Sequence, residues 1–242
     1  MKSLLATTFL LLLLCPSAPA AEVVRCGIAT GFPPYQYEAR GRPAGLDLKV
    51  IEAVGRKMGR TIEIVQHPWD QLLRLLETGE IECVAGMEVS TERARYALFS
   101  TPYYARQAVI FVRADNTTVV DEQSLEWSMV TGDRDSTIER RIAHNRIPGS
   151  YRFYPAASKL EAMELLRERE VIASIMPREV GFYLAKRLGF EVRVVGRPGK
   201  RAPVVIAVAR AYPQLHQQVQ RALANLIETG AIGPLLQMDD SH

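Results

Sequence analysis

Residues 46–65 read LDLKVIEAVGRKMGRTIEIV, a helical pattern that runs directly into a strand pattern. Apolar residues recur at helical spacing as far as Met58, and Gly59 follows where a glycine commonly ends a helix. The β-branched residues at 61–65 then predict a strand. The change from helical to strand periodicity indicates an α/β unit.

The same alternation continues on both sides of this stretch. Strands predicted at 23–29 and 81–87 and a helix predicted at 70–78 complete a strand–helix–strand–helix–strand order, which indicates a parallel sheet with helices on its faces. A second alternating set follows, so the chain carries two α/β units and we expect two small lobes. Its expected strands are 107–112, 127–131, 171–176, 190–195 and 204–209, and its helices are 137–144, one starting at Ser158 with a capping box to Glu161, 178–188 and 213–229.

The first residues have the features of a secretory signal peptide. Lys2 supplies a positive charge, residues 4–14 form an apolar run, and Ala18-Pro19-Ala20 gives a small-x-small cleavage site. The run is too short to span a bilayer, so we expect residues 1–20 to be removed near Ala20 and the protein to be exported. An uncleaved anchor is the alternative. No later segment is apolar over the length needed to cross a membrane.

Charge and cysteine content exclude several classes of protein. The formal net charge is +3, and basic residues are interleaved with acidic ones, which is unlike a nucleic-acid-binding surface. Only Cys26 and Cys83 remain after cleavage, and neither has metal-ligand spacing, so we expect no metal and no cofactor. In an oxidising compartment these cysteines are compatible either with a disulfide or with two separate buried thiols.

Ligands of open α/β sheets bind beyond the carboxyl ends of the strands, so the residues that follow each strand are the candidates for a site. In the first unit these include Phe32, Trp69, Glu88 and Arg93. Aromatic rings can stack on a ligand, and an arginine can hold a carboxylate through two hydrogen bonds. The alternatives are that both aromatic residues only pack in a core and that Arg93 pairs with a surface acid such as Glu92.

The second unit offers Ser136 and Thr137 at the start of a helix, and Arg178 after the strand at 171–176. Hydroxyl and free backbone N–H groups at a helix start can bind an anion, although helix capping alone also explains Ser136. The combined set contains no nucleophile–base pair. It therefore indicates a binding site, and we expect the protein not to be an enzyme.

Several segments, in this order and spacing, resemble the family-3 extracellular solute-binding proteins, the polar amino-acid receptors of ABC importers. The segments are 32–37 (FPPYQY), 45–48 (GLDL), 69–73 (WDQLL), 79–81 (GEI), 86–94 (GMEVSTERA) and 99–103 (FSTPY). The resemblance extends from about Val24 to Gly233. It implies an α/β periplasmic-binding-protein fold of type II, in which each lobe is a mixed, mostly parallel sheet flanked by helices.

The same resemblance implies how the chain is divided and where it works. Residues 21–107 plus 203–242 would form the first lobe and 108–202 the second, joined by a double-crossover hinge with the ligand in the cleft between them. The expected partners are a small polar solute and the membrane permease of an ABC importer. A monomer in the periplasm is expected.

The resemblance also assigns roles to individual residues. Aromatic residues at the positions of Phe32 and Trp69 sandwich the ligand, and the arginine at the position of Arg93 holds its α-carboxylate. Hydroxyls at the positions of Ser136 and Thr137 support that carboxylate from the second lobe. The first and third strands are adjacent in this family, which would place Cys26 and Cys83 in neighbouring strands.

Three positions depart from the family pattern. Pro177, followed by Arg178, stands where an aspartate usually binds the ligand's α-ammonium, and an arginine there would repel a cation. Glu88 replaces a serine or threonine and could take over the ammonium or pair with Arg93 or Arg178. Asp135 precedes the hydroxyl pair instead of the usual residues. Amino acids, modified amino acids, organic acids and small peptides are therefore all candidate ligands.

Two other functions are compatible with this sequence. The fold also hosts periplasmic lyases of the cyclohexadienyl dehydratase type, and Glu88 would be the candidate general acid or base. A non-transport accessory or sensor protein is the second alternative. The expected function remains a transport receptor whose lobes close on the solute.

Overall fold

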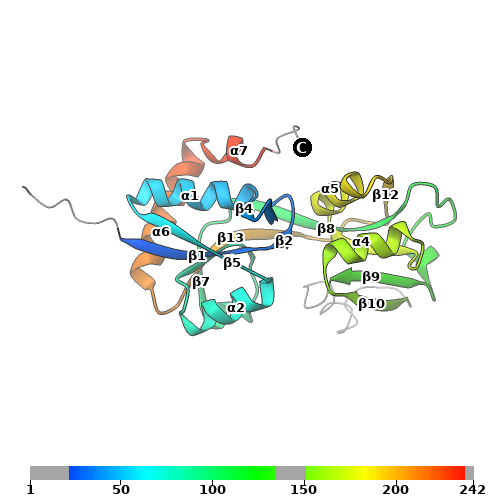
Figure 1. Ribbon diagram of the computed structural model, residues 1–242, viewed down its shortest axis with the longest axis horizontal. Coiled ribbons are helices and arrows are strands. Elements are labelled where there is room, and N and C mark those ends of the chain that lie inside the picture. Colours follow the sequence, from blue (N-terminus) through cyan, green and yellow to red (C-terminus); the bar gives the residue numbers. More distant parts are fainter. Residues whose placement is uncertain (1–21, 134–150, 238–242) are drawn as a thin grey trace, which may run out of the picture.

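The computed structural model describes residues 22–133 and 151–237. One ten-stranded sheet extends through this part of the chain (Figure 1), in the order β10-β9-β11-β8-β13-β6-β1-β5, with β12 also paired to β8 and β7 to β13. The strands are β1 (Val23–Ala29), β5 (Thr61–His67), β6 (Cys83–Glu88), β7 (Ala97–Phe99), β8 (Tyr104–Arg113), β9 (Met129–Asp133), β10 (Arg152–Ala156), β11 (Ala173–Pro177), β12 (Val192–Val195) and β13 (Arg201–Ala209).

Strand β8 connects the two halves of the sheet. Its first residues pair with β13, from Tyr104 opposite Val204 to Gln107 opposite Arg201. Its later residues pair with β11 and β12 in the other half. Strand β13 returns from that half and pairs with β6 and β7. In Figure 1 these two long strands run between the two halves, so the halves share a double crossover.

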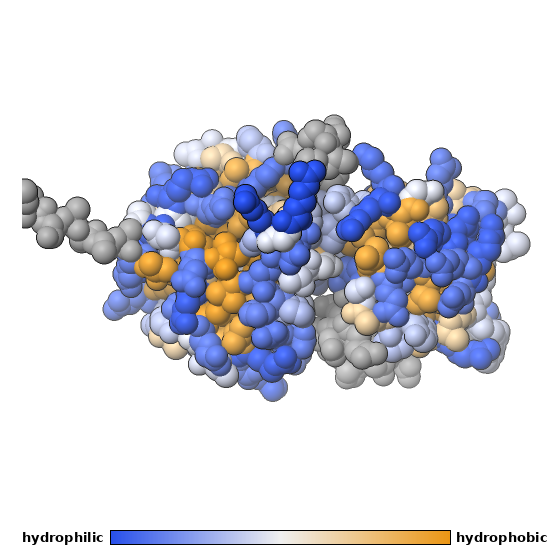
Figure 2. All heavy atoms as spheres, in the orientation of Figure 1, coloured by the Kyte–Doolittle hydropathy of each residue, from blue (hydrophilic) through white to orange (hydrophobic). Residues whose placement is uncertain are grey.

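Each half of the sheet is covered by helices. The first half carries α1 (Leu46–Met58), α2 (Trp69–Thr78), α6 (Pro213–Glu228) and α7 (Ile232–Leu235), and the second carries α4 (Lys159–Arg167) and α5 (Arg178–Leu188). Alternate residues of β6 face opposite sides, because Cys83 and Ala85 pack with α1 and α6 whereas Val84 packs with α2. In Figure 2 the apolar surface of one face forms separate areas on the two halves, with hydrophilic side chains around them.

A small sheet from the first half lies against the second half. It consists of β2 (Gly31–Phe32), β3 (Gln36–Ala39) and β4 (Arg42–Ala44). Phe32 and the buried Tyr35 and Leu46 pack in the same apolar cluster as residues of α4 and α5. This small sheet therefore places aromatic side chains where the two halves meet.

Most elements follow the predicted pattern. Helices α1 and α5 have the predicted bounds, and Gly59, Gly79 and Gly189 end their helices in the left-handed conformation. The Ser158 hydroxyl accepts from the Glu161 N–H at 3.1 Å, as a capping box requires, while the Glu161 carboxylate accepts from Ala157 N. The helix predicted at 137–144 lies outside the described residues.

Some boundaries were predicted wrongly. Strand β8 begins at Tyr104 instead of 107, and β13 begins at Arg201 instead of 204. The two extensions pair with each other, so long-range pairing overrides their polar composition. The short strands β2, β3, β4, β7 and β10 and helix α7 were not predicted. None of the helices in the described residues is long and apolar enough to cross a membrane.

Candidate functional site

Arg93 is fixed at the carboxyl end of β6 by a short 3₁₀ helix, η1 (Arg93–Arg95). Its side chain is 6% exposed, and its Nη1 donates to the Glu88 carbonyl oxygen at 2.8 Å. The guanidinium carbon lies 5.4 Å from the centre of the Trp69 ring, within the range of a cation–π contact. Three predicted site residues, Trp69, Glu88 and Arg93, are therefore brought together.

Trp69 is the first residue of α2 and is half-buried. It packs against the apolar cluster that includes Leu72 and Leu76 of the same helix. The indole thus packs against the apolar core and also contacts the guanidinium of Arg93. A role in core packing therefore does not exclude a role in stacking on a ligand.

Phe32 lies at the junction of the two halves. Its ring centre is 4.3 Å from the guanidinium carbon of Arg106 on β8 and 4.5 Å from the ammonium nitrogen of Lys159, the first residue of α4. A stacked contact of 5.8 Å joins it to the Tyr35 ring. Phe32 therefore contacts cations from two different elements.

Arg106 was not singled out from the sequence. Its guanidinium carbon lies 4.3 Å from the ring centre of Phe32, 4.6 Å from that of Tyr35 and 5.1 Å from that of Tyr104, so that three aromatic rings form a cage around it. The side chain is 5% exposed. The only sequence signal is a charged residue inside a strand that otherwise becomes apolar, which is too common to identify a site.

Hydrogen bonds fix the Arg106 guanidinium within this cage. Its Nη1 donates to the Gly86 carbonyl at 3.0 Å, and its Nη2 donates to Asp47 Oδ2 at 3.1 Å and also to the Tyr104 hydroxyl. Burial opposes the charge, but Tyr104, Asp47 and Glu88 outweigh it and raise the pKa of Arg106 above its ordinary value. The buried Nε has no hydrogen-bond partner among the described residues.

Asp47 is the centre of a buried polar network in the first turn of α1. Its carboxylate accepts from Gln36 Nε2 at 2.6 Å, from the Tyr103 hydroxyl at 2.7 Å and from the Tyr104 hydroxyl at 3.2 Å. Burial, and then the charge of Asp47, raise the pKa of Tyr103 well above its ordinary value, so its hydroxyl stays a donor.

The network requires glycine at position 86. Gly86 has φ +73°, and a Cβ there would lie 1.9 Å from Gln36 Nε2 and 2.1 Å from Asp47 Oδ2. The buried network and the positive φ thus explain why the GMEVSTERA segment begins with a glycine.

Arg178 lies apart from the group around Arg93 in the contacts of this structure. It is exposed, and its guanidinium carbon lies 5.1 Å from the ring of Phe182, one turn further along α5. The neighbouring Glu179 is the residue that reaches Tyr35: burial first, and then the charge of Glu179, raise the pKa of Tyr35 above its ordinary range. Pro177 is buried and precedes α5.

The remaining predicted residues are the hydroxyl pair of the second unit and the two cysteines. Ser136 and Thr137 lie outside the described residues. Cys26 and Cys83 are partners in the pairing of β1 with β6 and form a disulfide with their Cα atoms 4.6 Å apart. In the part of the chain that the structure describes, His, Cys, Asp and Glu side chains form no group that could hold a metal ion.

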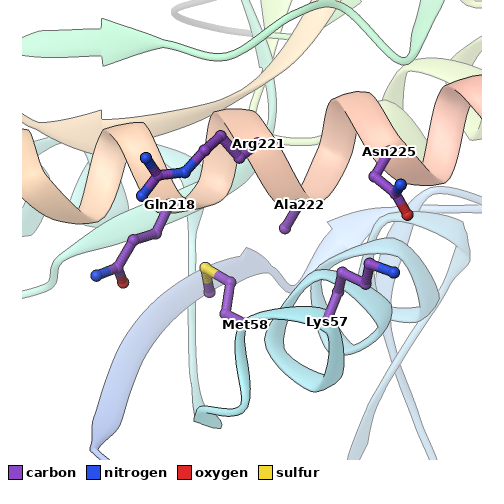
Figure 3. A pocket seen from close by; sticks show the side chains of 6 residues that line it. All are labelled: Lys57, Met58, Gln218, Arg221, Ala222 and Asn225. Atoms are coloured by element: carbon purple, nitrogen blue, oxygen red, sulfur yellow. The ribbon is translucent and has the colours of Figure 1, made fainter.

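A separate hollow lies between α1 and α6 (Figure 3). It has a volume of about 310 Å³ and is lined by Lys57, Met58, Gln218, Arg221, Ala222 and Asn225. The hollow is shallow, and its rim consists mainly of long polar side chains, so it lacks the aromatic walls and the buried guanidinium found beside β6. We therefore place the candidate site at Arg93 and not here.

Comparisons with known proteins agree with this architecture. The family model described as bacterial extracellular solute-binding proteins, family 3, matches residues 24–237. Arginine-binding protein 1 of an ABC transporter of Escherichia coli K12 is 29% identical over 100 residues; the match spans 40% of this chain and 41% of that protein, less than half of either. The L-arginine-binding protein of Pseudomonas aeruginosa is 27% identical over 74% of this chain and 71% of its own length.

A solved structure shares the fold at lower identity. A histidine kinase sensor domain with similarity to periplasmic binding proteins superposes with a TM-score of 0.79 at 22% sequence identity, covering 89% of this chain and 94% of the other. The same two-part architecture therefore occurs in a protein of a different class.

Proposed function

Because the chain belongs to the bacterial extracellular solute-binding proteins of family 3, we propose that it is a periplasmic receptor for an ABC importer. It traps a small polar metabolite, an amino acid or a related organic acid, and delivers it to the permease. The two lobes, residues 21–107 plus 203–242 and 108–202, close on the solute by bending β8 and β13, the two strands that join them.

One observation carries this proposal: the buried guanidinium of Arg93 at the carboxyl end of β6. A cation that is 6% exposed, oriented by a backbone carbonyl and positioned over an indole ring is suited to holding a carboxylate through two hydrogen bonds. Charge-assisted bonds of this kind are the strong ones in a binding site. The solute therefore presents a carboxylate to Arg93.

Two observations extend the candidate solutes from amino acids to organic acids without an amino group. Glu88 is the residue that could bind an ammonium, and its charge also contributes to raising the pKa of Arg106. Pro177 offers no side-chain acceptor, and the arginine that follows it stacks on Phe182. The aspartate that usually binds the ammonium in this family thus has no counterpart at Pro177 or Arg178.

The test is a binding screen with residues 21–242. Thermal shift and then calorimetry would use amino acids including L-arginine, organic acids and short peptides, since a bound solute raises the melting temperature by mass action. Arg93→Ala should weaken any hit about 30-fold or more, because truncating one partner of a buried charged contact costs about 2–5 kcal/mol. The matched control is Arg74→Ala, whose side chain forms an exposed pair with Asp70 and should leave affinity unchanged.

Two results would contradict the receptor proposal. One is a broad panel in which no solute shifts the melt, and the other is a hit that Arg93→Ala leaves intact. The lyase alternative is tested on the same samples: the bound acid is recovered and examined by NMR. A receptor returns it unchanged, whereas a lyase converts it and loses turnover in Glu88→Gln.

A further inference from the structure

We propose that Arg106 selects the solute: its guanidinium fills the aromatic cage beside Phe32 and binds a second carboxylate, so that the ligand is a small acid with two carboxylates, held by Arg93 and Arg106. The proposal rests on the receptor function and names the class of solute. It concerns residues in η1, in β8 and in and beside the small sheet, all of which the structure describes.

The first support is the occupied cage. A guanidinium enclosed by the rings of Phe32, Tyr35 and Tyr104 makes the cation–π contacts that a cationic ligand would otherwise make. A ligand cation entering beside Phe32 would meet both Arg106 and the ammonium of Lys159, which lies 4.5 Å from the centre of the same ring. Like charges at this range repel, so these two cations oppose the entry of a ligand cation beside Phe32.

The second support is the unsatisfied donor of Arg106. The two terminal nitrogens of the guanidinium have acceptors in Gly86, Asp47 and Tyr104, but the buried Nε has none among the described residues. Buried N–H groups nearly always have an acceptor, which can be supplied by a ligand. A carboxylate oxygen is the strongest acceptor for a guanidinium.

The third support is the spacing of the two arginines. Arg106 Nη1 is held by the carbonyl of Gly86, and Arg93 Nη1 by the carbonyl of Glu88, two residues further along β6. Residues two apart on a strand lie about 7 Å apart. Each guanidinium is within hydrogen-bond distance of its own carbonyl on the same strand, so we infer that an acid with a short carbon chain between its carboxylates contacts both.

Three acidic side chains act on this region and restrict the choice of solute. Asp47 pairs with Arg106, the charge of Glu88 acts on Arg106, and Glu179 acts on Tyr35. An amino group on the ligand could meet Glu88 or Glu179 while both carboxylates remain on arginines. The class therefore includes acidic amino acids as well as simple dicarboxylic acids.

The first experiment compares diacids with their monoamides on the wild-type protein by calorimetry. Succinate and L-glutamate are paired with succinamate and L-glutamine, and L-arginine is included. We expect at least one diacid to bind tenfold or more tightly than its monoamide, and L-arginine to show no binding. If a monoamide or L-arginine binds as well as the best diacid, this proposal is overturned while the receptor function stands. If neither diacid binds while another solute of the broader screen does, this proposal is likewise overturned and the receptor function stands.

The second experiment removes the guanidinium. Arg106→Met should reduce the preference for the diacid over its monoamide to about twofold, and an unchanged preference would overturn the proposal. Because Asp47 is left unpaired, the double variant Asp47→Asn/Arg106→Met serves if the single variant does not fold. The control is Arg193→Ala in β12, which also removes an arginine that donates to backbone carbonyls, those of Asn116 and Val119, and should keep the preference.

A third measurement tests the cage without any solute. Methylguanidinium should raise the melting temperature of Arg106→Ala at millimolar concentration, because it can occupy the vacated position between the rings, and should not raise that of the wild type or of Arg193→Ala. Equal responses in all three proteins would show that the rings do not form a guanidinium site, and the assignment of Arg106 would be wrong.

Discussion

Arg106 Nη2 and Asp47 Oδ2 lie 3.1 Å apart, and both side chains are almost completely buried. The pair connects the strand that crosses between the two halves, β8, to the first turn of α1. Hydroxyls of Tyr103 and Tyr104 and the amide of Gln36 complete the acceptor sites of the carboxylate. The pair therefore links one of the two crossover strands, β8, to α1, the helix that leads into β5.

Removing the charge of Asp47 should destabilise the protein strongly. Asp47→Asn leaves the guanidinium of Arg106 buried without its carboxylate, and losing one partner of a buried pair costs about 3–5 kcal/mol. Urea denaturation measures the free energy of unfolding. Asp70→Asn is the control, since its pair with Arg74 is exposed and is worth at most about 1 kcal/mol. Equal losses in the two variants would contradict a stabilising role for the buried pair.

A methyl group at Gly181 should also be poorly tolerated. Its Cβ would lie 2.1 Å from Cε2 of Phe111, a ring with no exposure to solvent. Overpacking of this kind costs about 1–3 kcal/mol. Gly233→Ala is the matched control, because nothing lies within 4 Å of a Cβ at that position. We expect the melting temperature to fall only in Gly181→Ala; a wild-type melt for that variant would show that α5 can move away from β8.

The disulfide should contribute substantially to stability. Cys26 and Cys83 are separated by 57 residues, and closing a loop of that length restricts the unfolded chain by about 4 kcal/mol in the chain-entropy model. Dithiothreitol should therefore lower the melting temperature of the wild type. The double variant Cys26→Ala/Cys83→Ala should start lower and not respond to the reductant. An unchanged wild-type melt in dithiothreitol would contradict this contribution.

The fold could be predicted from the sequence to a large extent because its signals are local. Periodicity and a terminal glycine define α1 and α5, and the alternation of elements indicates the parallel sheet. The small sheet β2–β4 was missed because its strands are very short and its Gly/Pro-rich sequence predicts a turn. The ends of β8 and β13 depend on their mutual pairing, which no local pattern records.

Only those residues of the candidate site that directly follow a strand could be predicted from the sequence. Residues that directly follow strands can be read from the chain, and Arg93 and Trp69 do lie together. Arg106 could not be found in this way, because it lies inside a strand and its importance arises from Phe32, Asp47 and Gly86, which are distant in sequence. A buried arginine is recognisable only once its aromatic and acidic neighbours are known.

The pH dependence of stability should include a contribution from Asp115. This exposed carboxylate accepts from Arg113 Nε at 3.1 Å and from Arg169 Nη2 at 2.7 Å. The pKa of Asp115 lies below its ordinary value of 3.8, mainly because Arg113 donates a hydrogen bond to the carboxylate. Since the folded-state pKa is lower than the unfolded one, the contribution is present above about pH 4 and is lost as the pH falls through the folded value.

The matched comparison for this prediction is Asp115→Asn, which lacks the titrating group. The melting temperature of the wild type should exceed that of the variant by a constant amount from about pH 7 to pH 5, and the difference should shrink at more acidic pH because protonation removes the same charge. The effect should be small, because Asp115 and Arg169 are exposed and solvent screens their interaction, although Arg113 is half-buried. A carbon-13 titration of the Asp115 carboxyl gives the pKa directly. A midpoint at or above the ordinary value, or a difference that grows toward acid pH, would show that the two arginines do not stabilise the carboxylate.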